Sequence, residues 1–484
     1  MSASLKVAKS SALLFAIQIV QRGLGIISTL ILARLLTPED FGVVALVTII
    51  LQFFELLVET GNQQYIVQKD TVSNADLNTA WSMDILIKSS ITVAIMACAP
   101  LLANFFDTPE LVLALPVAAL AIVIRAFRTP GMMVLAREIN YRPMFRLTLW
   151  QKGLSFLTVI ALALLHASYW AIIAGSLVSA VVLAIGSYRV HEFRPSWTLG
   201  NFREQWQFSR WLLLRGVVGF TRSQIDNLMV SRFFGTTSLG GYNLVREVSL
   251  LPALSAIIPM SEPLLASIAQ VRHTPEALAY RIRLALAVMV TLLTPITTFL
   301  LLYPELTINV LLGPQWSAYS HLLQPFALFF FTFCLFALVS DAVIALGKVR
   351  ALFTFDVLST VVIVTILLLF ATDTLGDMAW IRGWLAVATT FCLLGILNQW
   401  TAFGLWRLLW LSVPSILGSL GAAWLVSLPT WPALSGLWEF IFLGTLFVSA
   451  AALLIVGSGR ILLSGTEEWA QLHSLVRQAT RRTS

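Results

Sequence analysis

The stretch FSRWLLLRGVVGFTRSQIDNLMVSRFFGTTSLGGYN, residues 208–243, decides the fold of the whole chain. Its first part is apolar and long enough to cross a bilayer, which takes about 20 residues. It nevertheless carries Arg215, Gly219, Arg222 and Asp226, whose spacing of four, three and four residues places them on one helical face. A charged side chain in lipid costs about 2.5–3.5 kcal/mol on insertion scales. This face is therefore predicted to meet a partner helix or a water-filled cavity.

The same stretch repeats the beginning of the chain. When residue 30 is aligned on residue 228 without gaps, LILARLLTPEDFGVVALV lies on LMVSRFFGTTSLGGYNLV. Both segments contain an apolar helix, an arginine (Arg34 or Arg232), a short polar loop, a glycine (Gly42 or Gly240) and a second apolar helix. This shared order predicts a duplicated membrane protein with a charged interior.

Composition indicates an integral membrane protein. Of the 484 residues, 58% are hydrophobic and only 11% are charged, whereas soluble domains carry about 25% charged residues. The net charge of +7 sits largely in loops, which argues for membrane topology rather than nucleic-acid binding. No zinc-protease, Walker-type or hydrolase-elbow motif is present in the sequence. We therefore expect no enzyme activity, no cofactor and no metal site.

Apolar runs of about 20 residues predict roughly fourteen spans of an all-α polytopic membrane protein. They cover residues 10–33, 41–60, 80–104, 110–134, 143–165, 168–188, 208–233, 239–268, 279–302, 320–346, 349–371, 379–401, 406–428 and 437–457. Lys and Arg concentrate in alternate loops, which by the positive-inside rule predicts that both termini are cytoplasmic.

Six spans precede a polar linker, so the second half is predicted to repeat the first in parallel, about an axis along the membrane normal. The predicted organisation is a six-helix lobe over residues 1–190, a cytoplasmic linker over 191–207, a second six-helix lobe over 208–401, two additional helices over 402–458 and a cytoplasmic amphipathic tail over 459–484. The two lobes are expected to surround a central cationic cavity.

Polar and charged residues within the predicted spans form the candidate site. The substrate-binding candidates are the cavity cations Arg22, Arg215, Arg222, Arg125 and Arg128, and the polar lining is Gln18, Gln21, Gln224 and Asn227. The carboxylates that could couple transport to an ion are Glu55, Glu59, Asp84 and Asp226. Structural explanations compete for some of these, because Asp84 and Lys88 have the spacing of a helical ion pair, and Arg125 and Arg128 could extend to lipid headgroups.

Cations in the cavity favour an anionic ligand. A guanidinium is permanently charged and binds phosphate through two parallel hydrogen bonds. Since Arg22 and Arg222 lie on corresponding helices of the two halves, a cleft between the lobes would suit a lipid pyrophosphate. A cation exporter would need acidic groups there instead.

The segments LARLLTPEDFGVVAL, GGYNLVREVSLLP and LLGPQWSAYSHLLQPFAL resemble polysaccharide transporters of the Wzx type, in the flippase superfamily that includes multidrug and oligosaccharidyl-lipid transporters. The likeness is greatest to the colanic-acid and exopolysaccharide exporter branch. It extends over about residues 10–400.

The resemblance implies alternating access in the bacterial inner membrane. The substrate would be an oligosaccharide repeat unit linked to undecaprenyl pyrophosphate, for exopolysaccharide or lipopolysaccharide biosynthesis. Coupling to H⁺ or Na⁺ and cooperation with polymerase and co-polymerase proteins would follow. Two other functions stay open: a cation-coupled multidrug antiporter of the same fold, and a membrane-embedded glycan polymerase or ligase.

Overall fold

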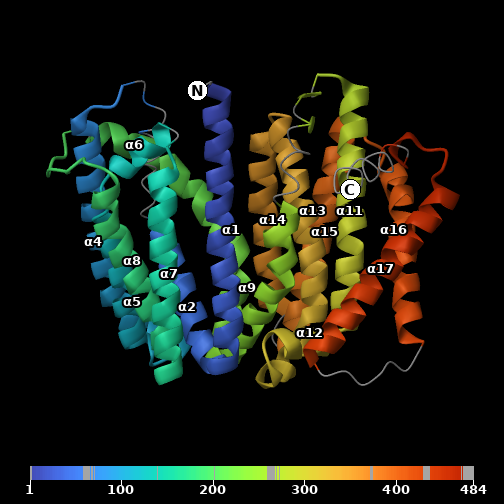
Figure 1. The fold of residues 1–484 in the computed structure, drawn as a ribbon, viewed down its shortest axis with the longest axis horizontal. Helices are drawn as coiled ribbons and strands as arrows, with labels where there is room; N and C mark the ends of the chain where they lie inside the picture. Colours follow the sequence, from blue (N-terminus) through green and yellow to red (C-terminus); the bar gives the residue numbers. More distant parts are fainter. Residues whose placement is uncertain are drawn as a thin grey trace. The chain divides into compact units, whose positions relative to one another are not determined.

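The computed structural model describes residues 3–57, 66, 69, 71–138, 140–200, 202–258, 267–268, 270–271, 273–370, 374–428, 436–469 and 471. Within these ranges the chain is helical and contains no β-strand, as predicted (Figure 1). It divides into two compact units, Met1–Asn243 and Leu244–Ser484.

The first unit is an antiparallel arrangement of long apolar helices. They are α1 (Ala3–Leu35), α2 (Pro38–Leu57), α4 (Asn74–Phe106), α5 (Leu111–Ala126), the short α6 (Gly131–Arg137), α7 (Arg142–Leu165), α8 (Trp170–Val190) and the larger part of α9 (Phe202–Pro252). Helix α7 packs on α1 and α8, and α5 packs on α2, α4 and α8. Helix α5 therefore lies at the centre of the described contacts in this unit.

The second unit begins with the end of α9 and the π-helical turn η1 (Ala253–Ile257). It continues with α11 (Pro275–Leu302), α12 (Pro304–Leu311), the 3-10 helix η2 (Pro314–Leu322), α13 (Leu323–Ala345), α14 (Val349–Phe370), α15 (Leu375–Thr401), α16 (Leu405–Ser427) and α17 (Gly436–Leu462). Helix α11 packs on α13 and α16, α13 packs on α15, and α16 pairs with α17.

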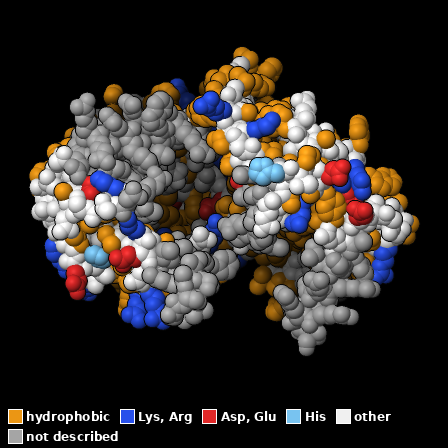
Figure 2. Space-filling view, turned by 90° about the horizontal axis from the view of Figure 1, so that it is seen from above, with side chains coloured by type: hydrophobic (Ala, Val, Ile, Leu, Met, Phe, Trp, Pro, Cys, Tyr) orange, Lys and Arg blue, Asp and Glu red, His pale blue; other side chains and the backbone are white. Residues whose placement is uncertain are grey.

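The surface of the described residues matches an apolar environment. Large hydrophobic side chains stand exposed along the helices, including Leu101, Leu164, Leu369, Trp424 and Leu453. Figure 2 views the protein from above, and charged side chains of both signs lie exposed on this face among hydrophobic and other side chains. Apolar flanks with polar ends are what a bilayer requires of a helical protein.

Most predicted spans correspond to single helices, but the count of about fourteen is not confirmed. In the part of the chain that the structure describes, eleven helices are long and apolar enough to cross a membrane, or twelve if the bent pair α5 and α6 is one span. The predicted span 110–134 is divided between two helices, because α5 ends at Ala126 and α6 begins at Gly131 after a bend of 64°. Pro130 disfavours helical backbone at the preceding residue.

The predicted spans 208–233 and 239–268 are separated by a break at Gly235, within the gap that the sequence predicts. Helix α9 runs from Phe202 to Pro252 and bends at Gly235, whose φ of 82° and ψ of 169° are not helical. That backbone region is open to glycine almost alone. The compact-unit boundary falls inside α9, after the linker predicted at 191–207, and the two-lobe division with its C-terminal appendage stays a prediction.

The bend brings two glycines into a backbone contact in the first unit. A Cβ atom added to Gly42 would lie 1.9 Å from the carbonyl oxygen of Thr236, and one added to Gly240 would lie 1.9 Å from that of Pro38. In the internal alignment, Pro38 corresponds to Thr236 and Gly42 to Gly240. The two segments, residues 38–42 at the α2 corner and residues 236–240 at the α9 corner, are equivalent in the alignment and contact each other reciprocally. Reciprocal contact between equivalent segments is the pattern of a two-fold symmetric interface.

A capping motif holds the α2 corner in place. The Thr37 hydroxyl accepts a hydrogen bond from the Asp40 backbone N–H at 3.2 Å, while the Asp40 carboxylate accepts from the Thr37 backbone N–H at 3.1 Å. The other Asp40 carboxylate oxygen accepts from the backbone N–H of Tyr169 at 2.9 Å. This reciprocal cap satisfies donors that the first helical turn leaves free, and it ties α2 to the start of α8.

A buried ion cluster fixes the residues that follow α17. The Glu468 carboxylate, fully buried, accepts from Arg283 Nε at 2.7 Å and from Arg407 Nη2 at 3.0 Å. Arg283 also donates to the Phe403 carbonyl oxygen at 2.7 Å, and the ring of Trp469 covers Gly459. The remainder of the predicted amphipathic tail lies outside the described residues, apart from Gln471.

Substitution of Gly42 tests the backbone contact. Gly42→Ala is expected to destabilise the protein by about 1–3 kcal/mol, the usual cost of overpacking, because its Cβ would meet a backbone carbonyl. The measurement is the thermal midpoint in detergent, followed by size-exclusion chromatography. Gly25→Ala is the matched control, since nothing lies within 4 Å of its added Cβ and both changes share the same gain in helix propensity. Equal midpoints for the two variants would contradict the contact.

Substitution of Glu468 tests the ion cluster. Burial alone would raise the pKa of the Glu468 carboxyl, but its backbone hydrogen bond and the two arginines outweigh burial and lower that pKa. The stabilisation is therefore present above the unfolded value of about 4.3 and is lost as the pH falls through the lowered pKa. Glu468→Gln is expected to lower the free energy of unfolding by about 2 kcal/mol at neutral pH. The difference in stability between parent and variant should become smaller on acidification. The control is Glu467→Gln, at the exposed neighbouring residue, which should show no such loss when thermal midpoints are measured in detergent.

Candidate functional site

A chain of side-chain amides connects α2 to both parts of α9 in the first unit. Asn227 Nδ2 donates to Gln224 Oε1 at 2.8 Å and to Asn243 Oδ1 at 3.4 Å. Gln224 Nε2 in turn donates to Gln52 Oε1 at 3.4 Å. Asn227 and Asn243 lie on opposite sides of the bend at Gly235, so the bend creates this arrangement.

The amide chain runs from a buried end to an exposed end. Asn227 is only 2% exposed, and its Oδ1 atom has no hydrogen-bond partner within the described part of the chain. Gln52 is exposed and Gln224 is half-buried. An amide both donates and accepts hydrogen bonds, so a row of amides matches a ligand that carries many hydroxyl groups.

Aromatic rings lie beside the exposed end of the amide chain. The rings of Phe53 and Phe220 are 5.4 Å apart, and those of Phe53 and Phe54 are 5.6 Å apart. Phe53 directly follows Gln52 on α2, and Phe220 lies one helical turn before Gln224 on α9. Aromatic faces next to a few placed polar groups are common in small-molecule sites.

The proposed coupling carboxylates occupy different environments. Asp226 is completely buried and accepts from the Tyr242 hydroxyl at 3.3 Å. Asp84 pairs with Lys88 Nζ at 2.8 Å, as the spacing of four residues predicts. Glu55 pairs with Arg125 across α2 and α5, and Glu59 lies outside the described residues. The ion pairs give Asp84 and Glu55 structural partners, while any coupling role stays a prediction.

The predicted cavity cations are also distributed. On α1, Gln18, Gln21 and Arg22 are exposed, and the helix packs against α7. Arg125 is half-buried, and its Nε donates to the Ala121 carbonyl oxygen at 3.1 Å. The remaining three predicted cations are Arg128, part-buried after the end of α5; Arg222, part-buried on α9; and Arg215, whose side chain lies outside the described residues.

The second unit contains a cationic pair that the sequence reasoning did not select. The guanidinium carbon of Arg382 lies 4.7 Å from the centroid of the Phe329 ring, and that of Arg246 lies 5.0 Å from the same centroid. Arg382 is only 5% exposed. The sequence feature that could have identified Arg382 is the energetic cost of an arginine in an apolar helix, the same feature that led to the selection of Arg22.

The residues that the structure brings together in the first unit are Gln224, Asn227, Gln52 and Asn243, with Asp226 on the same helix. Two of them, Gln52 and Asn243, were not in the predicted site because their partners are distant in sequence. Across the residues that the structure describes, no three His, Cys, Asp or Glu side chains form a group that could hold a metal ion.

Comparison with known proteins places these residues in a family context. The family model described as "Polysaccharide biosynthesis protein" matches residues 31–321. The chain is 24% identical to the succinoglycan biosynthesis transport protein ExoT of Rhizobium meliloti (strain 1021) over 297 residues, which are 61% of this chain and 60% of ExoT. It is 22% identical to the lipopolysaccharide biosynthesis protein WzxC of Escherichia coli (strain K12) over 384 residues, or 78% of this chain and 76% of WzxC.

A solved structure shows the same fold. The lipid II flippase MurJ in an inward closed conformation matches with a TM-score of 0.74 and 15% identity. The match covers 93% of this chain and 99% of MurJ. An identity this low establishes the shared architecture and nothing about the ligand.

The ion pair of Glu55 and Arg125 allows a test of whether these charges stabilise the fold. Both side chains are more than a third exposed, and exposed ion pairs contribute about 0–1 kcal/mol. We expect Arg125→Ala to change the thermal midpoint very little in detergent. The charge-reversed double variant, Glu55→Arg with Arg125→Glu, should be as stable as the parent protein. A loss well beyond 1 kcal/mol in Arg125→Ala would contradict this expectation and show that the pair is structural.

Proposed function

Because the chain belongs to the family of polysaccharide biosynthesis proteins, we propose that it is a flippase that moves lipid-linked oligosaccharide repeat units across the bacterial inner membrane. The units would be linked to undecaprenyl pyrophosphate and would pass from the cytoplasmic to the periplasmic leaflet. Exopolysaccharide or lipopolysaccharide biosynthesis would then use them. The observation that carries this proposal is the amide chain from Gln52 to Asn227 in a helical membrane protein whose relatives include one named as a transport protein.

The polar groups suit the two parts of such a substrate. Hydroxyl-rich sugars would bind the amides of Gln52, Gln224 and Asn227, with the Phe53 and Phe220 rings beside them. The pyrophosphate would bind guanidinium groups, for which Arg22, Arg215 and Arg222 are the leading candidates. A guanidinium holds phosphate with two directed hydrogen bonds, and the lipid chain would stay in the bilayer.

Transport would occur by alternating access. The chain carries no nucleotide-binding motif, so an H⁺ or Na⁺ gradient, the substrate gradient or a partner protein would drive the cycle. Asp226 is a candidate proton carrier because its carboxylate is fully buried beside the Tyr242 hydroxyl. Polymerase and co-polymerase proteins would receive the translocated units on the periplasmic side.

Two alternatives make different predictions. A cation-coupled multidrug antiporter would bind organic cations, and its deletion would change drug susceptibility. A membrane-embedded glycan polymerase or ligase would leave translocation intact and would alter only chain length. The arginine-rich candidate set favours an anionic substrate over an organic cation.

The proposal is tested in a strain that lacks the gene, complemented with variants. Without the protein, undecaprenyl-pyrophosphate oligosaccharides should accumulate on the cytoplasmic face and surface polymer should disappear. Arg22→Ala and Arg222→Ala should each fail to restore polymer while inserting normally, because the pyrophosphate would lose a bidentate partner worth about 1.5–3 kcal/mol. Lipid-linked intermediates and surface polymer are the quantities measured.

Arg189→Ala is the matched control, because Arg189 is an exposed residue at the end of α8, and it should restore export fully. Full export by Arg22→Ala, by Arg222→Ala and by the double variant would refute the assignment of these cations. Periplasmic repeat units with altered chain length in the deletion strain would instead support the polymerase alternative.

A further inference from the structure

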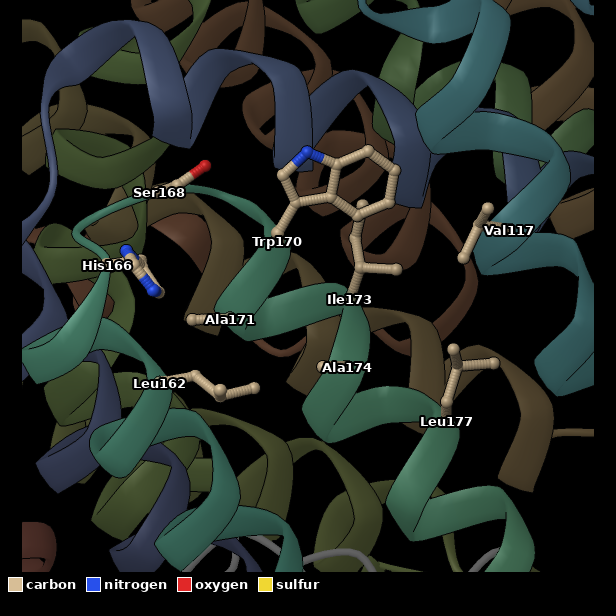
Figure 3. A pocket seen from close by; sticks show the side chains of 9 residues that line it. All are labelled: Val117, Leu162, His166, Ser168, Trp170, Ala171, Ile173, Ala174 and Leu177. Carbon is tan, nitrogen blue, oxygen red and sulfur yellow. The ribbon is translucent and has the colours of Figure 1, made fainter.

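An apolar pocket of about 370 Å³ lies among α5, α7 and α8, apart from the amide chain. Figure 3 shows His166 and Ser168 at one end and Val117 and Leu177 at the other, with Trp170 along one side. The pocket exists because α8 presents the small side chains of Ala171 and Ala174 between larger neighbours.

The pocket belongs to the surface that faces hydrocarbon. Val117 shares a helical face of α5 with Leu113 and Leu120, which are 66% and 41% exposed. Leu177 precedes Val181 by one turn of α8, and Val181 is also exposed. The pocket opens onto this surface, and its apolar lining binds hydrocarbon in preference to water, so the surrounding bilayer supplies its occupant.

The polarity of the pocket changes along its length. His166 and Ser168 lie in the short turn between α7 and α8, whereas Leu162, Ile173 and Leu177 line the part beside the helices. The ring of Tyr169 in the same turn is tilted against that of Trp170, with centroids 5.2 Å apart. Tyrosine and tryptophan at helix ends mark the headgroup level of a bilayer. The pocket therefore has the polarity of a phospholipid, with a polar mouth and an apolar shaft.

The surroundings of the mouth are acidic. Asp40 accepts a hydrogen bond from the Tyr169 backbone N–H at 2.9 Å. Glu110 directly precedes α5, the helix that packs on α8 and provides Val117 to the pocket. In agreement with this position, burial and then the negative charge of Glu110 raise the pKa of the Tyr169 phenol. These carboxylates disfavour an anionic headgroup and favour one that carries an ammonium group.

We propose that this pocket binds one acyl chain of a zwitterionic phospholipid, phosphatidylethanolamine, with its ammonium group toward Glu110. The chain lies against Ala174 and Leu177, and the phosphate lies at the His166 turn. The site is separate from the amide chain and does not depend on the proposed transport substrate.

Photo-crosslinking of the full-length protein in nanodiscs tests the site. Phosphatidylethanolamine and phosphatidylglycerol probes, each with a diazirine on the acyl chain, are compared at equal concentration, and adducts are located by mass spectrometry. The ethanolamine probe should label residues 162–177 about fivefold more than the glycerol probe. This is the difference in affinity that one favourable charge contact at an exposed surface gives. Equal labelling by the two probes, or no labelling of these residues, would overturn the proposal.

Variants separate the acyl-chain contact from the headgroup contact. Ala174→Phe fills the shaft and should abolish labelling, whereas Ala161→Phe, at an exposed position of α7 outside the pocket, should leave it unchanged. Glu110→Gln should keep acyl-chain labelling and remove the preference for ethanolamine, so the proposal stays testable if Ala174→Phe does not fold. Undiminished labelling of Ala174→Phe would refute the site, as would displacement of the probe by undecaprenyl phosphate.

Discussion

The first unit depends on two glycines that let backbone meet backbone. At Gly42 and Gly240 even one methyl group would collide with a carbonyl oxygen of the opposite corner. The bend at Gly235 sets the direction of the later part of α9, and the cap at Thr37 and Asp40 sets the direction of α2. The amide chain follows from this geometry, because it joins Gln52 on α2 to side chains on either side of the bend. Small residues allow such close approach wherever lipid provides no hydrophobic drive for helix association.

Polar groups within the helices are reconciled with an apolar exterior by pairing. Asp84 with Lys88, Glu55 with Arg125, and Glu468 with two arginines are ion pairs, and Phe329 provides an aromatic face for two more guanidinium groups. The amides of Gln224 and Asn227 differ, because they bind one another and leave the Asn227 oxygen with spare capacity. The buried carboxylate of Glu468 stabilises the scaffold through its paired charges, whereas the spare hydrogen-bonding capacity of Asn227 is available to a ligand.

Sequence patterns predicted the local features of this protein well. Apolar length located helices such as α7 and α16, and the four-residue spacing predicted the contact between Asp84 and Lys88. Features that depend on distant residues were not accessible in this way. The contact of Gln52 with Gln224 joins helices far apart in the chain, and Arg382 and Arg246 reach the same Phe329 ring from two other helices. The break inside α9 was accessible from the sequence, because Gly235 and the threonines after it have the composition of a loop, and Gly235 is the residue that departs from helical geometry.

The symmetric corner also records how such a chain can arise. Residue 42 contacts residue 236, the counterpart of residue 38, and residue 240, the counterpart of residue 42, contacts residue 38. A half-length ancestor that paired with a second copy of itself would make this contact twice, once from each subunit. Gene duplication and fusion would then convert a dimer interface into an internal one. Helix α9, which begins in one compact unit and ends in the other, makes that fusion hard to reverse, because cutting the chain before α9 would remove from the first unit a helix that completes it.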